Sequence, residues 1–290
     1  MMVPPTTGTP FARSFPGSFP FVVEVVAVPS AESSDFSGTT SSAYERFMGR
    51  YSMMLAPMLA DQAGVAAPMD VLDVGCGSGA LTRELVRRLD PSSVAACDPS
   101  PAFVADCRAQ FPGATVVPGS AEALPFETNR FDATLSQLVI HFMSDPDQAT
   151  AEMKRVTKPG GCVASSTWDT TGAMELLTYC DEAASMVDAS KGPFLTPRAF
   201  GEPGWVADVF ERIGLESVDE QRHTISVPYT DFDDFWTSIG GAGGSLGVFV
   251  RGCAPDELSR LRAVLFDRVG SPSGSFALSA MARSISGRVP

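Results

Sequence analysis

Apolar runs and amphipathic stretches alternate along the chain from about residue 43 onward. Short apolar runs bounded by turn-forming residues are typical of strands, and longer stretches with a helical repeat are typical of helices. Strands that alternate with helices indicate a parallel sheet covered on both faces. The expected strands are 70–74, 94–98, 114–118, 132–139, 162–168, 215–227 and 275–286. The pattern therefore predicts an α/β fold with a doubly wound sheet.

The helical stretches fall around and between these strands. Lys158-Pro-Gly-Gly161 combines a proline with two glycines and predicts the end of the helix before it. The glycine-rich run 240–247 predicts either a flexible surface loop or a mobile lid segment over a substrate. The expected helices are 43–63, 79–90, 101–110, 146–157, 173–189, 197–213, 231–239 and 255–269.

The N-terminal segment 1–42 differs from the rest, because it is rich in Pro, Ser, Thr and Gly. We expect a low-complexity, disordered extension. One apolar island, 19–28, either forms a loose strand on the body or indicates a start codon assigned too early. It does not resemble a secretory signal, since Glu24 interrupts it. Residues 43–290 then form one domain, with a cofactor-binding core at about 65–170 and a cap with C-terminal strands at about 171–290.

The stretch Asp73-Val-Gly-Cys-Gly-Ser-Gly79 carries most of the functional information. It places a glycine loop between a buried strand and the helix expected at 79–90. Glycine permits tight turns and removes Cβ atoms that would keep a ligand away. The first N–H groups of the following helix point at whatever lies over the loop. The stretch therefore predicts a nucleotide-like ligand.

The glycine spacing and two acidic residues narrow the choice of ligand. A dinucleotide fingerprint has the spacing G-x-G-x-x-G and binds a pyrophosphate. This loop has the spacing G-x-G-x-G, and Asp73, two residues before its first glycine, would repel a pyrophosphate. Asp98 ends the next apolar run, where a carboxylate can bind two ribose hydroxyls. These features favour a cationic ribosyl ligand without phosphate, such as S-adenosyl-L-methionine, over NAD.

The segment Val71–Thr82 resembles motif I of the class I S-adenosylmethionine-dependent methyltransferases. Later segments, in the same order, are similar to the branch that includes the ubiquinone/menaquinone-type (type 11) enzymes. These segments are Asp98–Pro101, Gly119–Phe126, Arg130–Ala133 and Glu152–Gly161. The resemblance implies a Rossmann-like sheet of seven mostly parallel strands with helical cap elements. It also implies that the last strand is antiparallel and lies between the fifth and the sixth.

The resemblance implies how the cofactor is held on the first two strands. Asp73 faces its ammonium group, directly or through water. Gly75 and Gly77 pack under its methionine part, and Asp98 binds its ribose. A different hypothesis for Asp98 is that it only caps the next helix.

Other roles implied by the resemblance lie further along the chain. The Ser120 side chain and the Ala121 backbone contact the adenine edge, although many relatives carry Asp at position 120. Glu122 belongs to this site or is a solvated turn residue. The other cofactor-binding candidates are Tyr44, Cys76, Gly79, Pro99 and Gln137.

His141 directly follows the fourth expected strand, at the rim toward which the transferred methyl group would point. It is a candidate general base or a packing residue at a helix start. In-line displacement from a sulfonium depends mainly on positioning and on exclusion of water. The predicted function is transfer of a methyl group to a small-molecule acceptor, apolar or aromatic. The alternative is a non-catalytic regulatory or assembly module that binds S-adenosyl-L-methionine.

Composition narrows the remaining possibilities. The formal net charge of −13 argues against a nucleic-acid substrate, which favours a basic surface. No run approaches the roughly 20 apolar residues that span a bilayer. The six cysteines contain no C-x-x-C pair and there are only two histidines, so no zinc site is expected. Reduced, buried cysteines in a cytoplasmic protein are the prediction.

Overall fold

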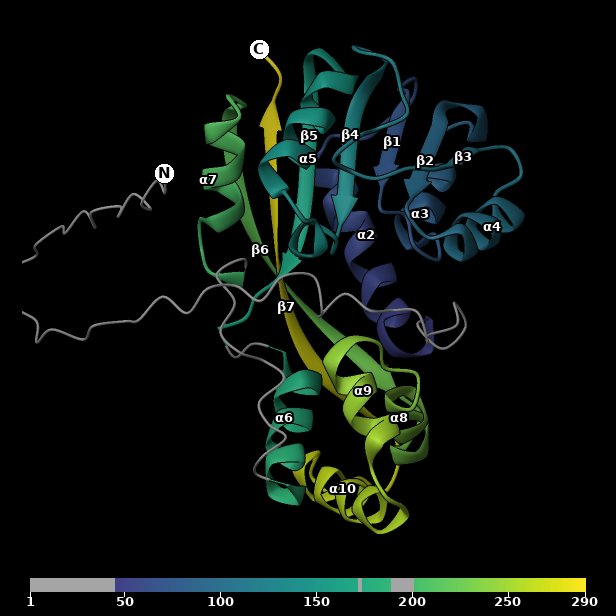
Figure 1. Ribbon diagram of the computed structural model, residues 1–290, viewed down its shortest axis with the longest axis vertical. Coiled ribbons are helices and arrows are strands. Elements are labelled where there is room, and N and C mark those ends of the chain that lie inside the picture. The colour runs from purple at the N-terminus through teal and green to yellow at the C-terminus, as the bar shows by residue number, and fades with distance from the viewer. Residues whose placement is uncertain (1–44, 172–173, 189–200) are drawn as a thin grey trace, which may run out of the picture. The chain divides into compact units, whose positions relative to one another are not determined.

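The computed structural model describes residues 45–171, 174–188 and 201–290. Its centre is a seven-stranded sheet with the order β3-β2-β1-β4-β5-β7-β6 (Figure 1). Neighbouring strands from β3 to β5 are parallel, and β7 is antiparallel to both β5 and β6. The predicted fold class and the position of the last strand are therefore confirmed. The strands are β1 (Val71–Val74), β2 (Val94–Asp98), β3 (Thr115–Pro118), β4 (Phe131–Gln137), β5 (Thr157–Trp168), β6 (Glu216–Tyr229) and β7 (Phe276–Arg288).

Helices cover both faces of the sheet. One face carries α2 (Arg50–Gln62), α3 (Ala80–Arg88) and α4 (Pro101–Gln110), and the other carries α5 (Pro146–Val156) and α7 (Trp205–Arg212). The strand interiors are buried on both sides because both faces are packed, as expected for a parallel sheet. The C-terminal ends of β1, β2, β3, β4 and β5 therefore meet at one edge, where ligands bind in doubly wound folds.

Strands β6 and β7 continue past this edge. The last pair between β5 and β7 is Trp168 with Ala282, whereas β6 and β7 remain paired as far as Tyr229 with Phe276. Four helices, here called the cap helices, pack on this extension (Figure 1). They are α6 (Glu175–Val187), α8 (Phe232–Ile239), α9 (Gly244–Gly252) and α10 (Pro255–Arg268). The register thus places the cap helices beyond the ligand edge of the sheet.

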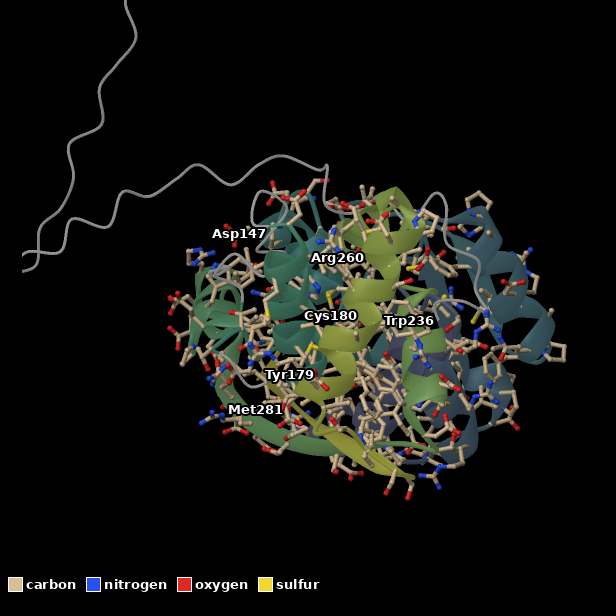
Figure 2. The ribbon with its side chains drawn as sticks, turned by 90° about the horizontal axis from the view of Figure 1, so that it is seen from below. Asp147, Tyr179, Cys180, Trp236, Arg260 and Met281 are labelled. Carbon is tan, nitrogen blue, oxygen red and sulfur yellow. The ribbon has the colours of Figure 1, made fainter. Side chains whose placement is uncertain are left out.

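The cap helices share one apolar cluster with the extension of β6 and β7. Figure 2 labels one of its members, Cys180 on α6, and two partly buried side chains that pack against it, Tyr179 on α6 and Trp236 on α8. Phe232 packs edge-on against Phe266 of α10 with ring centroids 5.0 Å apart. The cap is therefore held together by aromatic contacts within its own core.

The first turn of α2 is attached to the cap. The Arg50 guanidinium forms two hydrogen bonds with the Asp234 carboxylate of α8, at 2.8 and 3.1 Å. It also lies 4.4 Å from the centre of the Tyr229 ring at the end of β6. The hydroxyls of Tyr51 and Tyr229 are hydrogen-bonded at 3.0 Å and buried. These contacts fix the start of the leading helix against the cap.

Some element boundaries differ from the predictions. Helix 43–63 is a short π-helical segment, Glu45–Gly49, followed by α2. Helix α5 ends at Val156, just before Lys158–Gly161, as predicted, but β5 begins at Thr157 rather than at 162. The run 240–247, predicted as a flexible surface loop or a mobile lid segment, contains the start of α9, and the lid alternative stays a prediction. Segment 1–42 and Tyr44 lie outside the described residues.

No helix in the described parts of the chain is long and apolar enough to cross a membrane. Within the same parts, no three His, Cys, Asp or Glu side chains are grouped as a metal site would require. The six cysteines are free thiols, and five of them are buried.

Candidate cofactor site

The glycine loop follows β1 at the ligand edge, as predicted. Gly75, Gly77 and Gly79 have φ angles of 73°, 51° and 90°, which lie in the left-handed region that favours glycine. The tight turn therefore depends on glycine at all three positions. The helix after the loop is α3, which begins at Ala80.

Only one of these glycines leaves space for a ligand by lacking a Cβ atom. A Cβ at position 75 would lie 2.6 Å from the Val139 side chain, and a Cβ at position 79 would lie 2.6 Å from the Phe111 ring. Position 77 has no described atom within 4 Å of its Cβ site, so it alone faces open space. Gly75 and Gly79 are thus required for packing inside the protein, and Gly77 leaves room for a ligand.

We expect Gly75→Ala to destabilise the fold by about 1–3 kcal/mol, because the Cβ overlaps Val139 and the φ angle is strained. Gly77→Ala carries a similar φ penalty without the overlap. It is expected to unfold at a higher urea concentration than Gly75→Ala and yet to lose more ligand affinity. Urea unfolding of both variants, with binding measured by calorimetry, tests this. Equal unfolding midpoints would contradict the packing argument.

Four of the five N–H groups of the loop 75–79 are engaged within the described part of the protein. The Cys97 carbonyl accepts from the N–H groups of Gly75 and Cys76, at 2.8 and 3.0 Å. Gly77 N–H donates to Asp98 Oδ2 at 3.0 Å, and Gly79 N–H donates to the Cys76 carbonyl at 2.8 Å. A phosphate site needs such N–H groups directed at the ligand. Four N–H groups of this loop are therefore not available to a pyrophosphate.

Cys76 was predicted to contact the cofactor, but its side chain points into the protein. The thiol is buried in a cluster that includes Val104 and Cys107 of α4. Its N–H donates to the Cys97 carbonyl of β2, and its carbonyl accepts from Gly79 N–H within the loop. The structure shows the Cys76 side chain packed in the protein, and its contact with the cofactor stays a prediction.

Asp73 lies near the end of β1 and is only 1% exposed. Its Oδ2 accepts a hydrogen bond from Thr82 Oγ1 of α3 at 2.6 Å. Its Oδ1 is buried and has no hydrogen-bond partner among the described residues. Burial raises the pKa of Asp73 to about 7, and the nearby Asp98 charge adds to this effect, against the hydrogen bond from Thr82. A carboxylate in this state is suited to a cationic group, which would restore its charge.

Asp98 connects the glycine loop to the loop after β2. Its Oδ2 accepts from Gly77 N–H at 3.0 Å and its Oδ1 accepts from Ser100 N–H at 2.8 Å. The cap of α4 is Ser100, whose hydroxyl accepts from Phe103 N–H. The hypothesis that Asp98 only caps α4 is therefore wrong. Burial raises the pKa of Asp98, although the two backbone hydrogen bonds oppose that effect. Pro99 follows it and is exposed.

The loop after β3 carries Ser120, Ala121 and Glu122, as predicted. Glu122 is not a solvated turn residue: one of its carboxylate oxygens accepts from Ser144 N–H at 2.8 Å, and the other is hydrogen-bonded to Ser120 Oγ. The Gln148 side chain of α5 donates to the Glu122 carbonyl at 3.3 Å. Glu122 thus joins this loop to the segment that follows β4.

An ion pair on α5 forms hydrogen bonds with the backbone of the same loop. The sequence did not predict this ion pair. Glu152 Oε2 accepts from Leu124 N–H at 2.9 Å, and Arg155 donates to the carbonyls of Leu124 and Phe126. Glu152 and Arg155 are themselves paired at 2.6 Å. Two of the segments that carried the family resemblance, Gly119–Phe126 and Glu152–Gly161, are therefore structural partners.

The end of β4 brings Gln137 and His141 to the ligand edge. Gln137 Nε2 donates to the Ser52 carbonyl of α2 at 2.9 Å, and its Oε1 has no described partner. Leu138 has a φ of 60°, a strained conformation for a side chain of this kind, and such strain is typical of functional loops. His141 lies in a 3₁₀ turn, half-buried, with its Nδ1 3.3 Å from Thr167 Oγ1 of β5.

Three buried polar atoms without described partners share one face of the sheet: Asp73 Oδ1, Gln137 Oε1 and Ser166 Oγ. Asp73 pairs with Leu135, two residues before Gln137, and Gln137 pairs with Ser166. Residues two apart along a strand, and directly paired residues, point to the same face. Buried polar groups rarely remain unpaired. The first two atoms are acceptors beside the glycine loop, which fits a cofactor that carries an ammonium group.

Comparison with known proteins agrees with this geometry. A family model described as "Methyltransferase domain" matches residues 72–165. A malonyl-[acyl-carrier protein] O-methyltransferase of Herminiimonas arsenicoxydans is 30% identical over 200 residues, which cover 69% of this chain and 72% of that protein. The chain belongs to the class I methyltransferases of type 11.

Two further matches place this family member among its relatives. An uncharacterised methyltransferase of Mycobacterium bovis is 39% identical over 125 residues, 43% of this chain. The chain spans about half the length of this curated relative, 48%. A solved structure named as a type II methyltransferase, from Anaeromyxobacter dehalogenans, is 22% identical with a TM-score of 0.60 and covers 82% of this chain and 96% of that one. The structural match shows the shared methyltransferase fold.

Proposed function

We propose that this chain binds S-adenosyl-L-methionine and transfers its methyl group to a small-molecule acceptor. The observation that carries the proposal is the closed glycine loop. Four of its five N–H groups, those of Gly75, Cys76, Gly77 and Gly79, are satisfied internally, one of them by Asp98, and an unpartnered acceptor of Asp73 is buried beside it. Such a site favours a cationic ribosyl ligand over a phosphorylated one.

Different residues would bind different parts of the cofactor. Asp98 retains free lone pairs on both carboxylate oxygens after its two backbone hydrogen bonds, so it can also accept from two ribose hydroxyls. Asp73 and Gln137 supply acceptors for the ammonium group, and Gly77 leaves room for the methionine part. When bound, the cofactor supplies a methyl group already activated on a sulfonium.

The acceptor is proposed to be apolar or aromatic and to bind between the ligand edge and the cap helices. Trp168 ends β5 at this boundary and packs edge-on against Tyr51, with ring centroids 6.0 Å apart. His141 stands at the same edge and is the candidate to accept a proton from the attacking atom. The protein's contribution is then to align the acceptor and to exclude water.

Calorimetry and turnover assays test the proposal together. Purified protein is titrated with S-adenosyl-L-methionine, S-adenosylhomocysteine and NAD, and methyl transfer is followed by mass spectrometry against a panel of small aromatic and aliphatic acceptors. Binding of the first two ligands with transfer to at least one acceptor is the expected result. Binding without transfer to any acceptor would favour a regulatory module, and binding of NAD alone would overturn the proposal.

Asp98→Ala is expected to weaken binding of S-adenosylhomocysteine by about 1–3 kcal/mol, the scale of losing hydrogen bonds to a charged group. The matched control is Asp106→Ala, which removes the same charge from an exposed position of α4. Calorimetric titration of both variants measures the difference. Equal affinities would show that Asp98 serves only to hold the glycine loop.

A further inference from the structure

Strand β6 forms one edge of the sheet, and among the described residues it pairs only with β7 (Figure 1). It is 14 residues long, and most of its side chains between positions 219 and 224 are exposed. An edge strand presents a row of backbone N–H and C=O groups that can pair with another strand. This part of β6 is therefore accessible to a partner strand.

Pro228 indicates which residues of β6 direct their backbone groups outward. Proline has no N–H, so within a sheet it occupies edge positions whose N–H would face away from the neighbouring strand. The Pro228 carbonyl accordingly accepts from the Arg50 side chain, at 3.1 Å. The register with β7 is regular from position 219 onward, and backbone groups alternate between the two sides of a strand. Glu220 and Arg222 therefore direct their N–H and C=O groups outward, as Pro228 does.

The side chains of this stretch are complementary to a second copy of themselves. The sequence Asp219-Glu220-Gln221-Arg222-His223 has two acids before its central residue and two basic residues after it. When two such strands run antiparallel with Gln221 opposite Gln221, each Glu220 lies opposite an Arg222. Each Asp219 then lies opposite a His223, and a two-fold axis repeats both pairs. Oppositely charged side chains directly across two strands stabilise their pairing.

Other two-fold registers lack this complementarity. Moving the axis by one residue places Arg222 opposite Arg222 in one direction, or Glu220 opposite Glu220 in the other, and like charges in that position are destabilising. The paired stretch is also limited at both ends, because the register shifts between Glu216 and Asp219 and because Pro228 cannot donate. Charges on an edge strand usually discourage pairing, whereas these charges favour one register and disfavour its neighbours.

We propose that β6 is a homodimer interface in which two copies of this chain join their sheets edge to edge about a two-fold axis at Gln221. The outward backbone groups of Glu220 then pair with those of Arg222 in the second copy. The two seven-stranded sheets become continuous across the axis.

The hydrogen bonds that these acids already form are compatible with the dimer. Glu220 keeps its contact with Arg283, at 2.9 Å, because a carboxylate can accept from two guanidinium groups. Asp219 Oδ2 accepts from Gln221 Nε2 at 2.9 Å, and Asp219 Oδ1 can accept from His223 of the second copy. Dimerisation therefore adds contacts to β6 without breaking these two.

Cysteine cross-linking tests the register directly. Gln221→Cys places two thiols on the axis, in a non-hydrogen-bonded pair whose Cα atoms are about 4.5 Å apart, a separation that a disulfide can span. Oxidation with copper phenanthroline should convert this variant to a covalent dimer on a non-reducing gel. Thr224→Cys is the matched control, since it is also exposed on β6 but lies six residues, or about 20 Å, from its own copy in this register. The wild type controls for the native thiols, of which Cys253 is partly exposed.

Sedimentation equilibrium measures the dimer without a cross-link. The wild type should be a dimer, and Arg222→Glu should raise its dissociation constant about tenfold or more, because like charges then face each other on both sides of the axis. Arg260→Glu makes the same charge change at an exposed position of α10 and should leave the dissociation constant unchanged. Circular dichroism confirms that both variants are folded.

Three results would overturn the inference: a monomeric wild type, a dimer whose dissociation constant Arg222→Glu does not change, and a Thr224→Cys variant that cross-links as readily as Gln221→Cys. The cross-linking result does not depend on the stability of Arg222→Glu. None of these measurements requires S-adenosyl-L-methionine, so they test the interface separately from the proposed function.

Discussion

Replacing Arg283 with methionine is expected to lower the free energy of unfolding by about 3–5 kcal/mol, the range for removing one partner of a buried ion pair. Arg283 lies on β7 with its side chain 8% exposed. Its guanidinium contacts Asp169 Oδ2 at 2.8 Å and Glu220 Oε1 at 2.9 Å. The Asp169 side chain is fully buried, so its charge would be left without its main partner.

This cluster also links the point where the chain leaves the sheet after β5 to the point where it returns before α7. Helix α6 lies between these two points in the sequence. Asp169 follows β5, where the chain leaves the sheet, and its Oδ1 accepts from Thr171 N–H at 2.9 Å. Glu220 Oε2 accepts from Gly204 N–H at 2.9 Å, just before α7, where the chain has returned. Burial raises the pKa of Asp169, but hydrogen bonds from Thr171 and the charges of Arg283 and Arg222 outweigh this effect and hold it below its usual value. The cluster should therefore position the start of the cap as well as stabilise the fold.

Arg222→Met is the matched control for this prediction. Arg222 is the register partner of Arg283 on β6 and lies 3.4 Å from the same Asp169 oxygen, but its side chain is 55% exposed. An exposed pair contributes about 0–1 kcal/mol. Urea unfolding at neutral pH compares the two variants. If both lose the same free energy, burial of the Asp169–Arg283 pair has no special effect and the argument is wrong.

Much of the sheet could be predicted because its signals are local. Strands β1 and β2 are short, mostly apolar runs, and Asp98 could be placed at the ligand edge by counting one strand–helix–strand step. The order β5-β7-β6 came from the family resemblance instead, since no local signal specifies which strands pair over long sequence distances. The lengthening of β6 and β7 beyond β5 is likewise a property of their mutual pairing.

The errors arose where tertiary contacts override local preferences. The glycines of 240–247 predict a loop, but Leu246 and Phe249 are buried in the cap cluster, and that burial favours α9 over its poor helix propensity. The chain at Lys158–Gly161 continues β5 because Lys158 Nζ pairs with Asp132 at 2.8 Å and Gly161 packs where a Cβ would lie 2.7 Å from the Asp132 carbonyl. Neither contact can be inferred from neighbouring residues.

In the candidate site, too, the local sequence shows where the site lies, but tertiary contacts determine the role of each residue. The residue types at the glycine loop indicate a ligand, but the reason for each glycine lies in distant residues such as Val139 and Phe111. The role of Glu122 depends on Ser144, 22 residues away. A short motif therefore locates such a site, whereas the hydrogen-bond geometry determines what each member does.

Asp73→Asn is expected to stabilise the ligand-free protein, increasingly so as the pH rises. Burial raises the pKa of Asp73 to about 7 in the folded protein, whereas an unfolded Asp titrates near about 3.9. Between these values the unfolded chain has released a proton that the folded protein retains, so the free energy of unfolding falls as the pH rises. The penalty is absent below about pH 4 and complete above about pH 7, where it amounts to about 4 kcal/mol. Asparagine is of similar size, can still accept from Thr82 and carries no charge.

The effect on the ligand should have the opposite sign. An ammonium group beside Asp73 is attracted to the ionised carboxylate, so Asp73→Asn is expected to weaken binding of S-adenosylhomocysteine by about 1.5–3 kcal/mol. Urea unfolding at pH 5 and pH 8, with and without this ligand, measures both effects. Asp70→Asn, at an exposed position just before β1, controls for the loss of one charge. A variant equally stabilised at both pH values would contradict the raised pKa of Asp73 in the folded protein. Unchanged affinity would show that Asp73 does not contact the ligand. Gain of stability together with loss of affinity would instead identify this carboxylate as a group kept for binding at the expense of the fold.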